Sequence, residues 1–219
     1  MLDVELDLKA KDGQRRKATK MNAATAPYFV DFLGKRIMVY PHVFYPEIDT
    51  ELLAKSARVN PSDRVFEPFA GTGAIAIFLS NQSAAVVATD VNPDAVKNIS
   101  ENIRLHGLEK KARIELANIF PSSNEKFDVI VANPPYTDHE AKNIEEKSMW
   151  DKNHETIKNF FRDAKKYLTA KGKIYCSWSN FADFEFLEKL AKESGYSIKS
   201  VNEVAKVWQI YRVYEIEPL

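Results

Sequence analysis

Short apolar segments alternate with longer amphipathic segments from residue 64 to the C-terminus. The apolar runs predict buried strands at residues 64–66, 84–90, 113–116, 127–132, 173–178, 196–201 and 208–216. The segments between them predict helices at residues 73–79, 92–106, 154–168 and 184–194, the third of which is closed by a turn at residues 170–172. Because strands that alternate with helices are joined by right-handed crossovers, the pattern predicts an α/β fold with a doubly wound, mostly parallel sheet of seven strands.

Residues 1–40 follow a different pattern, and we predict that they form an N-terminal extension before a domain that spans residues 41–219. The first stretch, to about residue 26, turns basic at residues 9–17, and it indicates a frayed arm or a short helix because charge runs are usually solvated. The alternative interpretation is a flap that helps to bind a substrate. Aromatic and β-branched residues at 28–40 predict a strand or hairpin at a sheet edge.

Composition restricts the class of protein without identifying a substrate. The 219 residues include 31 Lys and Arg against 31 Asp and Glu, so the chain lacks a global basic field for non-specific binding to nucleic acid, although a nucleic-acid substrate is not excluded. The one cysteine, Cys176, cannot form an internal disulfide, and four scattered histidines give no metal-binding spacing. No apolar run approaches the roughly 20 residues that cross a bilayer. Residues 1–5 lack the apolar segment of a signal peptide. We therefore expect a cytoplasmic protein with no metal and no membrane partner.

A turn that contains two close glycines follows the strand predicted at residues 64–66. It reads Glu67-Pro68-Phe69-Ala70-Gly71-Thr72-Gly73, in a chain that has only seven glycines. Glycine lets backbone approach a ligand closely, and open α/β sheets bind ligands at the carboxyl ends of their strands. Asp90 ends the next strand, where a carboxylate can accept hydrogen bonds from both hydroxyls of a ribose. The two features together predict a nucleoside cofactor, whereas the glycines alone also suit a tight turn without a ligand.

Glu67 favours S-adenosyl-L-methionine over a dinucleotide as that cofactor. The glycine spacing does not decide between them, because the position three after Gly73 is Ala76, which the dinucleotide fingerprint tolerates. A carboxylate at the mouth of the turn would repel a pyrophosphate. It would attract the ammonium group of a methionine moiety, directly or through water.

The sequence Asn133-Pro134-Pro135-Tyr136, directly after the strand at residues 127–132, is the most specific motif in the chain. Consecutive prolines fix the backbone and have no N–H, so the turn presents carbonyl acceptors at the edge of the crevice. The Asn133 side-chain oxygen and the Pro134 carbonyl can each accept an N–H of an amine or amide, while Tyr136 packs against a planar group. These acceptors bind more strongly as positive charge moves onto the nitrogen, so transfer of a methyl group to it requires no general base.

Together these motifs resemble the class I S-adenosylmethionine-dependent methyltransferases that modify exocyclic or amide nitrogens, from about residue 40 to the C-terminus. Residues 43–53 are similar to the first segment of the small-domain methyltransferases, which include release-factor glutamine methyltransferases and adenine-N6 or guanine-N2 RNA methyltransferases. The resemblance implies a Rossmann-like sheet with an antiparallel last strand. It implies cofactor contacts by Glu67, Phe69, Ala70, Gly71, Thr72, Gly73, Asp90, Val91, Asn118, Ile119 and Asn133. It implies catalytic roles for Asn133, Pro134 and Tyr136, and substrate contacts by Tyr45, Pro135, Tyr136 and Trp150.

Three acceptors for the methyl group stay open on the sequence. A glutamine side chain in a protein is the first, by resemblance to the release-factor enzymes. An exocyclic amine of an RNA or DNA base and the amine of a small molecule are the alternatives. The full-length bacterial release-factor enzymes carry a helical substrate domain that about 40 residues cannot supply, whereas the archaeal and eukaryotic relatives lack that domain.

The acidic loop at residues 137–155 departs from the release-factor pattern. It carries Trp150 and His154 at the expected mouth of the crevice, where it could contact a cationic or small amine substrate. The alternative is a solvated loop on which Trp150 packs as a lid.

Aromatic residues also precede a further predicted helix, which runs through residues 52–54 and which Asp49 or Thr50 can cap. His42, Phe44 and Tyr45 lie where related enzymes place residues over the cofactor, so we expect at least one ligand contact among them. Aromatic packing at a sheet edge is the alternative.

Overall fold

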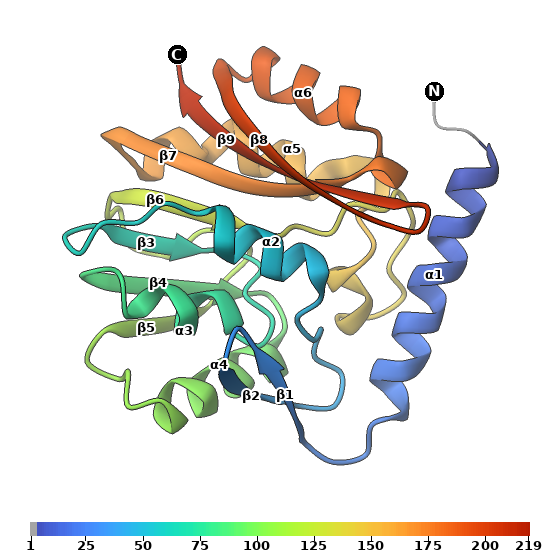
Figure 1. The fold of residues 1–219 in the computed structure, drawn as a ribbon, viewed down its shortest axis with the longest axis horizontal. Coiled ribbons are helices and arrows are strands. Elements are labelled where there is room, and N and C mark those ends of the chain that lie inside the picture. The colour runs from blue at the N-terminus through green and yellow to red at the C-terminus, as the bar shows by residue number, and fades with distance from the viewer. Residues whose placement is uncertain (1–3) are drawn as a thin grey trace.

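The computed structural model describes residues 4–219, and seven of its strands form one central sheet (Figure 1). These strands are β3 (Arg64–Glu67), β4 (Ala85–Asp90), β5 (Ala112–Leu116), β6 (Phe127–Ala132), β7 (Leu168–Ser179), β8 (Tyr196–Lys206) and β9 (Gln209–Pro218). Their order is β5-β4-β3-β6-β7-β9-β8. The pairs from β5 to β7 are parallel, and β9 lies antiparallel between β7 and β8. The predicted mostly parallel sheet with an antiparallel last strand is confirmed.

Helices cover both faces of the sheet, because consecutive residues of a strand point to opposite sides. The helices are α2 (Ile48–Ser56), α3 (Ala74–Ser80), α4 (Pro93–Leu105), α5 (Glu155–Asp163) and α6 (Phe184–Glu193). Val65 packs in the hydrophobic cluster that includes residues of α2, α3 and α4. Its neighbour Phe66 packs in the cluster that includes residues of α5 and α6. Full burial of each such side chain stabilises the fold by about 1.5–3 kcal/mol.

The strand order places two segments that are distant in sequence at one edge of the sheet. β3 lies beside β6, although β4 and β5 come between them in the chain. From β3 the chain continues to β4 on one side of this pair, whereas from β6 it continues to β7 on the other side. This reversal leaves a crevice beyond the carboxyl ends of β3 and β6. The turn after β3 and the turn after β6 therefore meet at that crevice.

The N-terminal residues form a long helix and a separate hairpin. The helix α1 (Val4–Ala23) spans 20 residues, and β1 (Tyr28–Phe32) pairs with β2 (Lys35–Val39) in a two-stranded sheet of its own. The expected frayed arm or short helix is wrong for residues 4–23, because one face of this helix is buried against the domain. Residues 1–3 of the predicted extension lie outside the described residues. The domain boundary between residues 40 and 41 stays a prediction.

The hairpin is held by a helix and not by the edge of the central sheet, so its expected position is wrong. Asn98 and Asn102, one turn apart on α4, are fully buried. The side-chain oxygen of Asn102 accepts a hydrogen bond from the Met38 N–H at 2.8 Å, and that of Asn98 accepts one from the Tyr40 N–H at 2.8 Å. Both side-chain amides donate to the Met38 carbonyl. One edge of β2 thus pairs with β1, and on its other edge two asparagines satisfy the backbone groups of Met38 and Tyr40.

Two further boundaries differ from the sequence pattern. α2 begins after Glu47, whose backbone N–H donates to the Thr50 hydroxyl at 3.2 Å, so neither Asp49 nor Thr50 occupies the cap position. The helix predicted at residues 154–168 ends at Asp163 and continues as a 3₁₀ turn to Tyr167. β7 then begins at Leu168, which pairs with Phe127 before the register shifts. The turn predicted at residues 170–172 is therefore an irregularity inside a strand.

No helix among residues 4–219 is long and apolar enough to cross a membrane.

Candidate functional site

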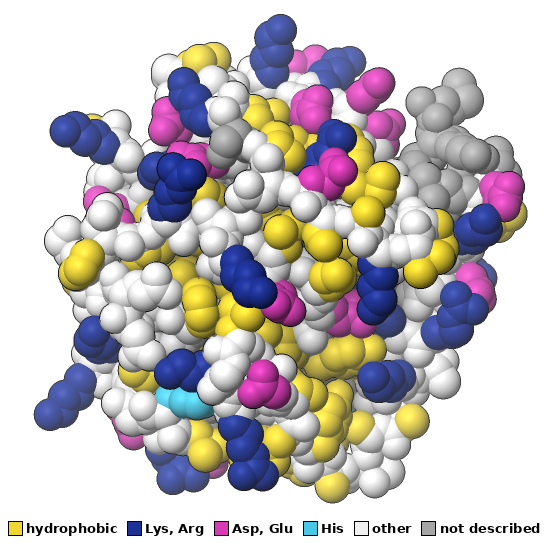
Figure 2. Space-filling model, viewed as in Figure 1, with side chains coloured by type: hydrophobic (Ala, Val, Ile, Leu, Met, Phe, Trp, Pro, Cys, Tyr) yellow, Lys and Arg dark blue, Asp and Glu magenta, His cyan; other side chains and the backbone are white. Residues whose placement is uncertain are grey.

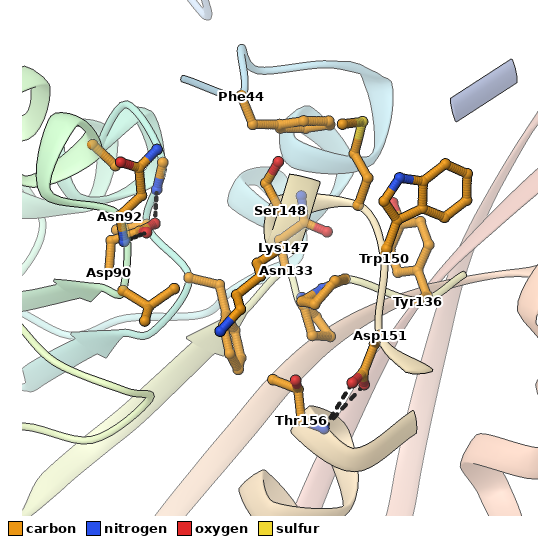
Figure 3. A pocket seen from close by; sticks show the side chains of 18 of the residues that line it. Phe44, Asp90, Asn92, Asn133, Tyr136, Lys147, Ser148, Trp150, Asp151 and Thr156 are labelled. Atoms are coloured by element: carbon orange, nitrogen blue, oxygen red, sulfur yellow. Dashed lines mark hydrogen bonds between the residues drawn. The ribbon is translucent and has the colours of Figure 1, made fainter. Parts of the chain in front are cut away.

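A cavity of about 400 Å³ lies at the carboxyl ends of the strands, within the range of about 300–1,000 Å³ that is usual for small-molecule sites. Figure 3 shows Asp90 and Asn92 on one side of it and Tyr136 and Trp150 on the other, with Asn133 between them. Fourteen of the predicted ligand-contacting residues line the cavity, namely Glu67, Phe69, Ala70, Gly71, Thr72, Asp90, Val91, Asn118, Ile119, Asn133, Pro134, Pro135, Tyr136 and Trp150. Gly73 and Tyr45, both described by the structure, are not among the lining residues.

The backbone of the glycine turn after β3 lies close both to the cavity and to neighbouring segments of the chain. Gly71 has φ +55°, and a Cβ atom there would lie 3.2 Å from the Phe44 carbonyl oxygen. Gly73 has φ +74°, and a Cβ atom there would lie 2.9 Å from a methyl carbon of Ile99 on α4. Gly73 is therefore a packing residue, whereas Gly71 belongs to the cavity wall. Phe69, also in the wall, holds φ +59°, a conformation uncommon outside glycine that is often found at functional sites.

Asp90 at the end of β4 is held by backbone groups from two loops. Its Oδ2 accepts a hydrogen bond from the Gly71 N–H at 2.9 Å, and its Oδ1 accepts one from the Asn92 N–H at 2.8 Å. Burial raises the pKa of Asp90, and the hydrogen bonds from Asn92, Gly71 and Val91 oppose that rise. Each carboxylate oxygen keeps a lone pair, so the fixed carboxylate can accept hydrogen bonds from two hydroxyl groups.

Glu67 lies deep in the same wall. Its side chain is buried, and its Oε2 accepts a hydrogen bond from the Ala76 N–H of α3 at 2.7 Å. Burial raises the pKa of Glu67 to about 8, the Ala76 N–H lowers it, and the nearby Asp90 carboxylate raises it further. The cavity therefore holds two carboxyl groups whose pKa values are raised, and such perturbed groups cluster at functional sites.

The loop after β5 forms a third wall. Ile119 lines the cavity with φ +72°, which is a strained conformation for a β-branched residue. The Thr89 hydroxyl donates a hydrogen bond to the Ile119 carbonyl, which holds the loop against β4. Asn118 precedes it in the same wall.

The Asn-Pro-Pro-Tyr turn is fixed by a buried hydrogen-bond network. The Asn133 side-chain oxygen accepts a hydrogen bond from the Ser177 hydroxyl of β7. The Asn133 side-chain nitrogen donates to the Thr50 hydroxyl at 3.3 Å and to Asp49 Oδ2 at 3.4 Å. The Tyr136 hydroxyl also donates to Asp49. One lone pair of the Asn133 oxygen is therefore already used, and the other remains for a ligand.

Tyr136 contributes its ring to the cavity, because its hydroxyl is used inside the protein. The side chain is buried, and its ring meets Trp178 edge-on at 5.6 Å and Phe181 edge-on at 5.5 Å between centroids. Burial raises the pKa of Tyr136 well above its ordinary value, and the Asp49 carboxylate raises it further. The hydroxyl therefore stays protonated and acts as a donor.

The loop at residues 137–155 closes the cavity opposite Asp90. Trp150 is buried in the lining, its ring lies edge-on to His139 at 4.8 Å, and it packs with Met149 and Met21. The lid interpretation of Trp150 thus agrees with its packing, although its lining position also allows a substrate contact. His154 is not among the lining residues, and its ring packs against Phe186 at 4.5 Å.

A lysine of this loop, which the sequence analysis did not single out, extends into the cavity. Figure 3 shows the Lys147 side chain between Asp90 and the Asn133 turn. Lys147 lines the cavity and is exposed. The charged loop thus presents a cation to the cavity, in contrast to the acidic character that its composition indicates.

The aromatic segment before α2 contributes Phe44 to the lining and turns Tyr45 away from it. The two rings stack at 5.9 Å, and the Lys20 ammonium lies 4.4 Å from the centre of the Tyr45 ring. The expected ligand contact in this segment stays a prediction, for which Phe44 is the residue placed in the lining, while Tyr45 packs against α1.

Several other polar lining residues lie outside the predicted set, among them Asp49, Thr50 and Gln14. Asp49 and Thr50 were considered only as helix caps, and Gln14 lay inside a basic run. These residues lie far in sequence from the glycine turn and the Asn133 turn, so no local pattern indicates that they line the same cavity. Within residues 4–219, no group of three or more metal-ligating side chains comes together.

Comparison with known proteins identifies the family. The chain matches the methyltransferase small domain family over residues 44–214. It is 40% identical over 111 residues to a release factor glutamine methyltransferase of Aquifex aeolicus, covering 48% of this chain and 40% of that protein. It is 30% identical over 155 residues to a tRNA1(Val) (adenine(37)-N6)-methyltransferase of Parabacteroides distasonis, covering 68% of this chain and 65% of that protein. The chain thus spans less than two thirds of the length of either relative.

A solved structure supports the fold. The 16S rRNA N2 G1207 methyltransferase of T. thermophilus, in complex with AdoMet and guanosine, superposes with a TM-score of 0.66 at 21% identity. The superposition covers 88% of this chain and 50% of that one. It agrees with the Rossmann-like sheet implied by the motifs. The family match confirms the predicted family resemblance. Because the family match extends over most of the sequence, the chain belongs to the methyltransferase small domain family.

Proposed function

We propose that the protein is an S-adenosylmethionine-dependent methyltransferase that acts on the nitrogen of a planar NH₂ group, with the side-chain amide of a protein glutamine as the first candidate. The observation that carries the proposal is the fixed Asn133 side chain in the cavity wall. Its amide is oriented by Ser177 on one side and by Thr50 and Asp49 on the other. An oxygen fixed in this way can accept an N–H without reorganisation during the reaction.

The lining residues fit the proposed cofactor chemically. Asp90 keeps lone pairs for two ribose hydroxyls, and the strained Ile119 would flank a base. Glu67 is a carboxyl group in an apolar setting, so a nearby ammonium group would favour its ionised form. Bound in this cavity, S-adenosylmethionine would supply a methyl group activated by a sulfonium.

The acceptor site would act through position and charge. The Asn133 oxygen and the Pro134 carbonyl would each accept one N–H of the NH₂ group, which aims the nitrogen lone pair out of the plane of the group. Positive charge develops on the nitrogen as it gains the methyl group, so both hydrogen bonds strengthen in the transition state. The nitrogen then loses a proton to solvent. Because Lys147 extends into the cavity, a cationic acceptor is disfavoured by like-charge repulsion.

A second candidate acceptor, the exocyclic amine of an RNA base, is favoured by one observation. Figure 2 shows Lys and Arg side chains along the side of the molecule that carries α1. Arg15, Arg16 and Lys20 of this helix are exposed, beside the segment that lines the cavity. Such side chains bind phosphate groups without reading base sequence.

Transfer of a labelled methyl group distinguishes the candidates. The protein is incubated with tritiated S-adenosylmethionine and a cell extract that has been separated into protein, RNA and small-molecule fractions. We expect label in the protein fraction. Label in RNA, lost as the salt concentration rises, would select the second candidate, and no label in any fraction would contradict the proposed function.

A further inference from the structure

One face of α1 is directed at the domain, and a glutamine lies in its centre. Ala10, Gln14, Lys17 and Met21 recur every three or four residues, which places them on one side of the helix. Ala10, Gln14 and Met21 are buried, and Lys17 is half-buried. The neighbours Arg15 and Arg16 are exposed on the opposite side.

Contacts at both ends of this face fix α1 across the cavity. Ala10 packs in the hydrophobic cluster that contains Tyr136 and Trp178. Met21 packs with Met149 and Trp150 of the lid loop. Between them, the Lys17 ammonium forms an ion pair with Glu47, the residue that caps α2. Gln14 is therefore held in place by packing on either side of it.

Gln14 is a lining residue of the cavity, and it is only 4% exposed. Its side-chain nitrogen donates to the Thr137 hydroxyl at 3.4 Å, and Thr137 directly follows Tyr136 of the Asn133 turn. Its side-chain oxygen is buried and has no hydrogen-bond partner among the residues described. A buried polar atom without a partner destabilises a fold, so such an atom in a cavity wall indicates a ligand contact.

We propose that Gln14 is a substrate-binding residue whose side-chain amide hydrogen-bonds the NH₂-bearing group of the methyl acceptor. This proposal rests on the proposed function and extends it to a helix outside residues 44–214, which match the family. The oxygen of Gln14 accepts an N–H of the acceptor, next to the turn that presents Asn133 and Pro134. α1 thus contributes to the choice of acceptor as well as to the closure of the cavity.

The replacement Gln14→Met tests the proposal, because methionine has a similar length and no hydrogen-bonding group of comparable strength. The probe is the fraction of the extract, protein or RNA, into which the wild-type enzyme transfers label. We expect the KM for that fraction to rise about five- to tenfold, as follows from the loss of one neutral hydrogen bond. The Kd for S-adenosylhomocysteine should change less than about twofold, because Gln14 is not proposed to bind the cofactor.

Thermal unfolding separates a binding role from a structural one. Since Gln14→Met removes a buried atom that lacks a partner, we expect its melting temperature to stay at or above that of the wild type. Gln14→Glu keeps an oxygen acceptor and should keep the KM within about threefold of the wild type. Gln82→Met, the same change at an exposed position, is the matched control and should alter neither quantity.

Three results would overturn the inference. The first is an unchanged KM in Gln14→Met. The second is a melting temperature of Gln14→Met low enough to account for its loss of activity. The third is a rise of KM in Gln14→Glu equal to that in Gln14→Met. If the wild-type enzyme labels no fraction, the proposed function itself fails. A labelled fraction with a normal KM in Gln14→Met would refute only the role of Gln14.

Discussion

The hydroxyl of Ser177 on β7 donates a hydrogen bond to the side-chain oxygen of Asn133 at the end of β6. Ser177 is fully buried, so this bond fixes which side of the Asn133 amide carries the oxygen. The nitrogen is then turned toward Thr50 and Asp49. In the proposed reaction Ser177 is a positioning residue, because it acts on the acceptor only through Asn133.

Ser177→Ala should therefore reduce turnover without weakening cofactor binding. Loss of one neutral hydrogen bond is worth about 0.5–1.5 kcal/mol, which corresponds to a fall in kcat of about two- to tenfold. The measurements are the rate of methyl transfer and the Kd for S-adenosylhomocysteine. Ser62→Ala, at an exposed position, is the matched control. A loss of cofactor affinity equal to the loss of rate would contradict the positioning role.

Tyr136→Phe removes the hydroxyl that donates to the buried Asp49 carboxylate. Because a buried carboxylate that loses a donor is destabilised, we expect the free energy of unfolding to fall by about 1–3 kcal/mol. Denaturant unfolding measures this change. The double variant with Asp49→Asn should lose less than the sum of the two single variants, since the two side chains interact. Strict additivity would show that the contact contributes nothing to stability.

Glu67 should make stability depend on pH. Burial raises its pKa in the fold from 4.5 to about 8, so the folded protein keeps the carboxyl protonated where the unfolded chain ionises it. Its contribution to stability is fully present below about pH 4.5 and is lost as the pH rises toward 8. Within this window it lowers the free energy of unfolding by about 1.4 kcal/mol per pH unit.

Glu67→Gln tests this dependence, because an amide oxygen can still accept the Ala76 N–H but the side chain cannot ionise. Unfolding curves measured from pH 5 to 8 should show a flatter profile for this variant than for the wild type. Glu109→Gln, the same change at an exposed position, should leave the profile as it is. Parallel profiles for the wild type and Glu67→Gln would refute the raised pKa.

The sequence could predict the features that depend on local rules. The turn at Gly71, the carboxylate at Asp90 and the Asn133 motif each directly follow a buried strand, and the topology of a parallel sheet brings such strand ends together. Their meeting at one cavity follows from the strand order and needs no knowledge of side-chain packing.

The remaining features depend on contacts between distant segments. Asp49 and Tyr136 are 87 residues apart, and only the tertiary packing of α2 against the sheet brings them together. The buried face of α1 was hidden, because Gln14 and Lys17 interrupt its apolar spacing with polar side chains. The local pattern predicts a helix up to Leu168, but this residue pairs with Phe127 in the sheet.

The rate of methyl transfer by Asn133→Ala tests the central claim most directly. With tritiated S-adenosylmethionine at saturation and the labelled fraction as acceptor, we expect the rate to fall about 100-fold or more, as for the loss of a fixed group that stabilises transition-state charge. The Kd for S-adenosylhomocysteine should stay within about threefold of the wild-type value. A rate equal to that of the wild type would contradict the proposed role of the Asn133 turn.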